Sequence, residues 1–298
     1  EALLRVAKRA LKLPEHWAIA ALSFVAIFFF AVPFPFIVLA AALFGFFRAT
    51  RAVVPVPFTA QVPFSETART IVAWLIIWFA PLFAVAAVYG REHVLTQLGW
   101  FFSKLAVVTF GGAYAVLAYM GQDVVDKFHW LDAGQMMDGL GLAETTPGPL
   151  ILVNEFVGYL AAYRQGGGPP VVMGILGALV VLWATFAPCF LWIFAGAPYI
   201  ERIASMPRLK SALSAITAAV VGVVLNLSVW FALHVLFREV GDVALGPLHT
   251  SVPSLASLDW RAALLALLAA VLLFRFHASM LAVLGLSGAL ALAMSWLA

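Results

Sequence analysis

Long apolar stretches without any Asp, Glu, Lys or Arg most constrain what this chain can fold into. A helix needs roughly 20 apolar residues to cross the hydrocarbon core of a bilayer. The charge-free stretches comprise residues 16–47, 70–90, 105–122, 165–200, 211–237, 262–274 and 276–298. Charged residues make up 10% of the 298 residues, against roughly 25% in a soluble domain. We therefore expect an all-α polytopic membrane protein, a bundle of roughly eight or nine transmembrane or half-spanning helices.

Prolines and glycines divide these stretches. The first carries "VPFP" at its middle, and proline lacks a backbone donor and clashes with the preceding turn. We expect two short helices that meet at Pro33–Pro35. The stretch 165–200 opens with "QGGGPP", so its helix is expected to begin near Val171. A further apolar segment at about 145–163 is interrupted by Glu155.

The two ends of the chain share a pattern. Residues 17–45 and 260–288 align at a constant offset that pairs Trp17 with Trp260 and Gly45 with Gly288. Two unrelated apolar hairpins could give the same few identities. An inverted-topology repeat, common in secondary transporters, is the other interpretation. It divides the chain into two parts, a basic segment with the end hairpin of an incomplete first repeat (1–69) and a complete second repeat (70–298).

Adjacent glycines interrupt the stretch 105–122 within "TFGGAYAVLAYMGQD", which covers residues 109–123. Gly111 and Gly112 weaken a helix and permit close approach of another backbone. If a helix restarts there, its free N–H groups form a site for an oxyanion. Thr109, Phe110 and Tyr114 would then flank the anion. Close packing between helices is the alternative explanation.

A second interruption falls in "GLAETTPGPL", residues 141–150. Proline disfavours helix in the residue before it and suits the first turn of a new helix. Pro147-Gly148-Pro149 thus predicts that one element ends and a half-helix starts at Pro149, with Thr145 and Thr146 as hydroxyl donors. Irregular backbone at membrane depth is tolerated against protein or a water-filled cavity. A plain interfacial loop is the alternative.

Polar residues near these breaks are candidates because such groups are costly in lipid. Lys104 could neutralise an anion, or its side chain could extend to the membrane interface. Glu144 could carry a coupling proton or brace the turn. Asn154 is expected to face the same cavity, and Asn226 either cross-links helices or contacts the ligand. The remaining acidic residues of this region are expected in a solvated loop with helix caps: Asp123, Asp126, Asp132 and Asp138.

These motifs carry a family resemblance. The segments "KLAVVTFGGAYAVLAYMGQDVV", "GLAETTPGPL" and "FAPCFLWIFAGAPYIERI" closely resemble the second half of the chromate transporter family, over about 100–237. Upstream, "VPFPFIVLAAALFG" resembles the end of the family's first half. The phenylalanine-glycine-glycine and proline-glycine-proline motifs match the family's signature positions, which are Phe110, Gly111, Gly112, Pro147, Gly148 and Pro149.

The resemblance implies a secondary transporter of the bacterial cytoplasmic (inner) membrane that exports chromate and confers resistance, without a cofactor or nucleic acid. Long members carry two homologous halves of opposite orientation, and short members act in pairs. Because most of a first half is missing, we expect a fragment of a longer protein, a homodimer, or a chain that pairs with the missing half. An inside-negative potential favours export of a dianion by about 2.3 kcal/mol per charge per 100 mV.

Three rival functions follow from the same residues. Sulfate has the shape and charge of chromate, so another oxyanion could be the substrate. A truncated half could instead act as a non-transporting subunit. An intramembrane enzyme is disfavoured, because the chain has no GxxxxGK[ST], HExxH or GxSxG motif. One cysteine, Cys189, allows no intrachain disulfide, and no Cys/His spacing suggests a metal site.

Overall fold

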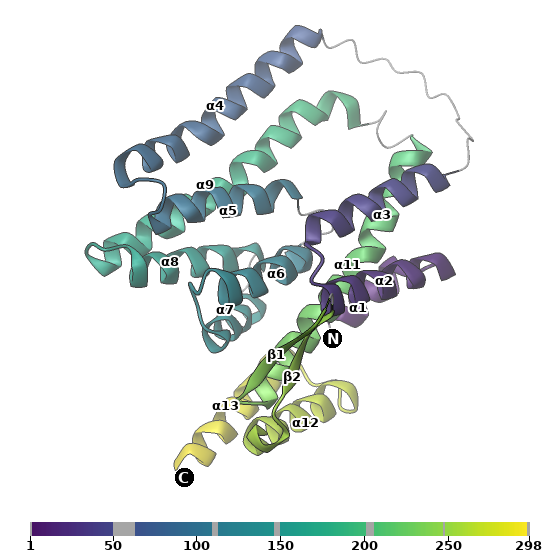
Figure 1. Ribbon diagram of the computed structural model, residues 1–298, viewed down its shortest axis with the longest axis vertical. Coiled ribbons are helices and arrows are strands. Elements are labelled where there is room, and N and C mark those ends of the chain that lie inside the picture. The colour runs from purple at the N-terminus through teal and green to yellow at the C-terminus, as the bar shows by residue number, and fades with distance from the viewer. Residues whose placement is uncertain are drawn as a thin grey trace.

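The computed structural model describes residues 2–49, 63–108, 113–145, 150–200, 206–246 and 248–296. These residues form α-helices with one two-stranded hairpin, so the expected all-α membrane architecture is confirmed (Figure 1). Among them, three helices are long and apolar enough to cross a membrane. These are α4 (Phe64–Tyr89), α9 (Pro170–Gly196) and α11 (Pro207–Leu236).

The helix α11 is the central element of one half of the molecule. Within its most apolar window 67% of residues are buried by protein, against 11% for α4, so α11 packs against helices while α4 faces lipid. The most extensive contacts of α11 are with four helices. They are α1 (Ala2–Ala10), α2 (Pro14–Phe30), α3 (Phe34–Arg48) and α6 (Ala113–Gln122).

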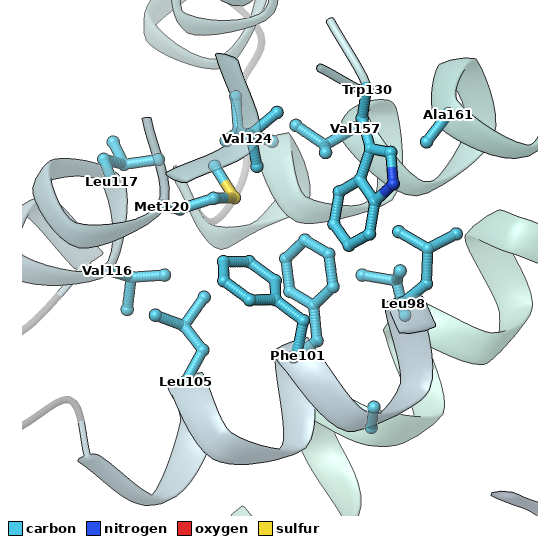
Figure 2. Packing of buried hydrophobic residues seen from close by; sticks show 14 of the residues in the cluster. Leu98, Phe101, Leu105, Val116, Leu117, Met120, Val124, Trp130, Val157 and Ala161 are labelled. Carbon is cyan, nitrogen blue, oxygen red and sulfur yellow. The ribbon is translucent and has the colours of Figure 1, made fainter. Parts of the chain in front are cut away.

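A second group of helices surrounds the buried Trp130. Phe101, Val124 and Val157 converge on the indole from three different elements (Figure 2). The group comprises α5 (Val94–Val108), α7 (Ala133–Thr145) and α8 (Val153–Gln165), together with the π-helical turn η1 (Asp123–Lys127). Within it, α5 and α8 pack against α9, and α5 also packs against α4.

The proline-bounded helices lie close to their expected positions. The first stretch divides into α2 and α3, and Ala31 between them takes a left-handed conformation with φ 49°. The helix α9 begins at Pro170, one residue before the expected Val171. The helix α5 begins at Val94, well before the charge-free stretch at residue 105, because Val94, Leu95 and Leu98 are buried in the core.

Glycines set the closest helix crossings. A Cβ added at Gly222 of α11 would meet the carbonyl oxygen of Ala20 and the backbone of Phe24 in α2. A Cβ at Gly177 of α9 would meet the carbonyl oxygen of Gly158 in α8. Such small residues let helix backbones approach each other in a membrane, where packing rather than the hydrophobic effect drives association.

A proline inside α4 is compensated by a tryptophan from α9. Pro81 has no N–H, so the carbonyl of Ile77 loses its helical donor. The indole Nε1 of Trp183 donates to that oxygen at 3.1 Å. The bond matters because the surrounding lipid offers no replacement donor.

The C-terminal region contains a hairpin that the sequence analysis did not predict. Strand β1 (Val240–Leu245) pairs antiparallel with β2 (Leu248–Pro253), which packs against α2. After them come α12 (Trp260–Phe274) and α13 (Met280–Trp296), at the end of the molecule opposite α4 (Figure 1). Short 3₁₀ turns complete the described elements: η2 (Leu150–Leu152), η3 (Ala197–Tyr199) and η4 (Leu255–Ser257).

The helix pairs α2–α3 and α12–α13 have similar lengths and similarly placed breaks, but different surroundings. A Cβ at Gly45 of α3 would lie 2.5 Å from the Ser211 carbonyl oxygen of α11. The aligned Gly288 of α13 has nothing within 4 Å of a Cβ among the described residues. The repeat stays a hypothesis. The hairpin α2–α3 is packed against α11, whereas Gly288 of the hairpin α12–α13 is exposed.

Candidate functional site

Described elements flank both sequence motifs. The helix α5 reaches Val108 and α6 begins at Ala113, on either side of residues 109–112. The helix α7 reaches Thr145 and η2 begins at Leu150, on either side of residues 146–149. The turn η2, which follows the second motif, packs against α6, which follows the first. The elements that follow the two motifs are therefore neighbours.

Most of the predicted anion-contacting atoms lie outside the described part of the chain. This applies to all atoms of eight residues, namely Thr109, Phe110, Gly111, Gly112, Thr146, Pro147, Gly148 and Pro149. It also applies to the side chains of Tyr114, Glu144 and Thr145. The expected half-helix start at Pro149 falls in the same gap. The chain continues beyond it as the 3₁₀ turn η2, and regular α-helix begins at Val153.

Asn154 lies in the first turn of α8 and is buried, with 2% of its surface exposed. Its Nδ2 donates to the Thr185 hydroxyl of α9 at 3.4 Å. Its Oδ1 has no partner among the described residues. Burial of an amide oxygen without a donor is unfavourable. Asn154 is therefore a buried polar side chain with an unsatisfied acceptor, just after η2. It does not line the cavity described next.

A cavity of about 720 Å³ opens at the break between α2 and α3. It has room for roughly two dozen water molecules at about 30 Å³ each. Its polar and charged lining comes from four segments that are separate in sequence. Those residues are Lys104, Tyr119, Gln122, Asp123, Asp126, Lys127, Asn226, His249, Thr250 and Ser251.

Lys104 is the predicted cationic residue that the structure places in this cavity. Its side chain is exposed, whereas those of the neighbouring Ser103 and Leu105 are buried at 4% and 1%. Burial raises the pKa of the Asp123 carboxyl, and the positive charges of Lys127 and Lys104 partly offset that rise. Both ammonium groups thus line the same cavity as a half-buried carboxylate.

Asn226 lines the same cavity from α11. It is buried, with 2% of its surface exposed, and its Nδ2 donates to Oε1 of Gln122 in α6 at 3.3 Å. The predicted cross-link between helices is therefore present, and it forms part of the cavity wall. Lys104 and Asn226 come together here, while Asn154 lies elsewhere.

The solvated-loop expectation is wrong for Asp123. That residue opens the π-helical turn η1 and is half-buried, because the buried Val124 anchors the turn in the core. The expectation of a helix cap holds for Asp132, whose Oδ1 accepts from the Gln135 N–H at 2.8 Å at the start of α7. The "GQD" triplet at 121–123 was the available signal for Gln122 and Asp123, since it follows an apolar run directly.

Comparison with known proteins gives consistent matches. The family model described as "Chromate transporter" matches residues 96–292. The chromate transport protein of Cupriavidus metallidurans is 34% identical over 131 residues, which are 44% of this chain and 30% of that protein. The probable chromate transport protein of Synechococcus elongatus is 31% identical over 144 residues, 48% of this chain and 34% of that protein.

An uncharacterized transporter of Methanocaldococcus jannaschii is 28% identical over 202 residues, 67% of this chain and 47% of that protein. The matches therefore span between about a third and a half of the curated relatives' own lengths. No solved structure matches the chain significantly.

Proposed function

Because the chain belongs to the chromate transporter family, we propose that this multi-pass membrane protein exports chromate from the cytoplasm across the bacterial inner membrane. The observation that carries the proposal is the contact between α6 and η2, the elements that follow the two family motifs. A transporter needs polar backbone at membrane depth, and helix breaks at the two motifs would supply it.

We place the anion between the two restarted helices. N–H groups of the 109–112 and 146–149 segments would donate to the tetrahedral dianion, because the first N–H groups of a helix have no intrahelical acceptor. Hydroxyls of Thr109, Thr145 and Thr146 would add donors. Full neutralisation by basic side chains is then unnecessary, since helix N-termini carry partial positive charge.

The proposed driving force is an ion or potential gradient. The chain has no phosphate-binding loop for ATP. Outward movement of a dianion is favoured by an inside-negative potential, at about 2.3 kcal/mol per charge per 100 mV. Glu144, beside the second interruption, is the proposed coupling residue if a proton is exchanged.

A partner is part of the proposal. The helix α12 has no buried residue, and Gly288 of α13 has nothing within 4 Å of a Cβ among the described residues. Both helices of the aligned hairpin α2–α3 pack against α11. A second copy of this chain, or a first half of the same transporter, would supply a helix like α11 for α12–α13.

The test is chromate accumulation in cells that express the chain, with two variants in the motifs. Gly112→Leu and Pro149→Ala should each reduce chromate export by about tenfold or more, because both alter oriented backbone donors. Gly196→Leu and Pro207→Ala are the matched controls, since Gly196 has nothing within 4 Å of a Cβ among the described residues and Pro207 starts α11. Equal loss in motif and control variants would contradict the motif site.

Sulfate is the competing substrate with the same shape and charge. The same cells should be assayed with excess sulfate in the medium and with radiolabelled sulfate as cargo. Export of chromate that sulfate does not reduce supports chromate as the substrate. Export of sulfate alone would replace chromate with sulfate in the proposal.

A further inference from the structure

The cavity at the α2–α3 break follows one face of α11. Four residues of that helix line it at intervals of three or four, Val223, Asn226, Trp230 and Leu233, which is the spacing of one helical face. Strand β2, which packs against α2, adds His249, Thr250 and Ser251 to the lining. The cavity therefore lies between one face of α11 and the polar hairpin.

The cavity lies alongside the interior of α11 and not only its end. Asn226 lies ten residues before Leu236, where α11 ends, and ten residues correspond to roughly 15 Å at about 1.5 Å per residue. The cavity extends one turn further along α11, to Val223.

The charges in the cavity balance. Lys104 and Lys127 carry positive charge, and Asp123 and Asp126 carry negative charge. His249 and Tyr119 are the other titratable groups in the lining. An entering anion would meet two cations in a cavity whose wall also carries the half-buried Asp123. A carboxylate at this place competes with any anion for the same ammonium groups.

We propose that this cavity is an access site for the transported oxyanion, separate from the interrupted-helix motifs, in which Lys104 attracts the anion and Asp123 competes with it. The inference rests on the proposed function for the identity of the anion. The volume leaves room for the anion together with water. The donor group of Asn226 is already engaged with Gln122 in the cavity wall.

The experiment uses purified full-length chain in detergent and a cysteine-reactive probe. Cys189, the one cysteine of the sequence, is first replaced in Cys189→Ala. Val223→Cys and Leu233→Cys then report on the two ends of the α11 face of the cavity. Val220→Cys is the control, because Val220 is fully buried and does not line the cavity. Uncharged N-ethylmaleimide is the reagent, and sulfate is the anion, because chromate oxidises thiols.

The inference predicts that both cavity cysteines react faster than Val220→Cys and that sulfate slows them, whereas chloride at equal ionic strength does not. In the Val223→Cys background, Asp123→Asn should lower the half-protecting sulfate concentration about fivefold, and Lys104→Gln should raise it about fivefold or more. Asp138→Asn makes the same substitution on an exposed part of α7 outside the cavity and should have no effect.

Several outcomes would overturn the inference. They are a Val223→Cys reaction as slow as that of Val220→Cys, protection by chloride equal to that by sulfate, or an Asp123→Asn variant in which protection is unchanged or weaker. The near-isosteric Asp123→Asn decides the question even if Lys104→Gln fails to insert. Protection is measured without transport, so export without protection removes this inference alone. Protection without export removes the proposed function alone.

Discussion

At the scale of single residues, Asp259 shows how one carboxylate organises the C-terminal region. Its Oδ1 accepts from the backbone N–H groups of Arg261 and Ala262 at 3.0 and 3.2 Å, and its Oδ2 accepts from the Arg238 guanidinium at 3.0 Å. The backbone N–H of Ala262, then the Arg238 side chain, lower the pKa of this carboxyl. The residue caps α12 and ties it to the segment before β1.

We predict that Asp259→Ala accelerates hydrogen exchange at the Arg261 and Ala262 amides about fivefold, the ratio expected for loss of a typical N-cap. Asp259→Asn should retain most of the protection, because Asn is also a good cap. Since the folded-state pKa is lowered, the charge-dependent protection is complete above the ordinary aspartate pKa. It is lost as the pH falls through the lowered value. Equal exchange in all three proteins would contradict the cap.

Trp183 permits a rescue experiment. Trp183→Phe removes the donor to the Ile77 carbonyl and should lower the stability of the protein in detergent by about 1–3 kcal/mol. In the Pro81→Ala background, the helix supplies its own N–H to that carbonyl. Trp183→Phe should therefore lower the stability much less in that background. Thermal unfolding of the four proteins gives the coupling energy. Purely additive effects would show that the indole contributes packing alone.

At the scale of elements, glycines distinguish packed from unpacked helices. Gly222→Ala should destabilise the chain strongly, because a Cβ there would meet the backbone of α2. Gly288→Ala in α13 should leave the stability unchanged or slightly higher. Ala favours helix, and no described atom lies within 4 Å of the added methyl group. Unfolding temperatures of both variants measure the contrast, and similar shifts would contradict the helix packing described here.

The helices were predictable wherever prolines and charges bound them. The break between α2 and α3 follows from Pro33 and Pro35, and the start of α9 follows from "GGGPP". The start of α5 was not predictable from the sequence. The segment "VLTQLGWFFSK" mixes polar and apolar residues, and its burial depends on partners from α8 and α9. The hairpin was missed because "VGDVALGPLHTSVP" follows a long apolar helix and shows its alternation in two short strands only.

The candidate site was predictable only in part. Lys104 and Asn226 stand out because polar groups are rare in apolar helices. Their meeting in one cavity depends on α11 crossing both α2 and α6, which no local pattern encodes. The side chains of β2 complete the lining from far along the sequence. The role of the two motif segments remains a prediction that the family match supports.

At the scale of the whole molecule, the proposed partner would cover the exposed α12–α13 pair. When the chain is expressed alone, a second copy is the available source of a helix like α11. In a Cys189→Ala background we predict that Gly288→Cys forms a dimer with a short bis-maleimide in membranes. Ile76→Cys on the lipid-facing α4, with Ile76 61% exposed, is the control and should stay monomeric. Monomer in both cases would favour pairing with a separate first half.

Chromate flux tests the central claim most directly. Everted inner-membrane vesicles containing this chain should take up chromate at a rate that rises with an inside-positive diffusion potential, because the vesicle interior corresponds to the cell exterior. Empty vesicles and vesicles with Gly112→Leu should show background uptake. A well-inserted chain that takes up no chromate at any potential would contradict transport by this chain, and uptake independent of potential would contradict the proposed driving force.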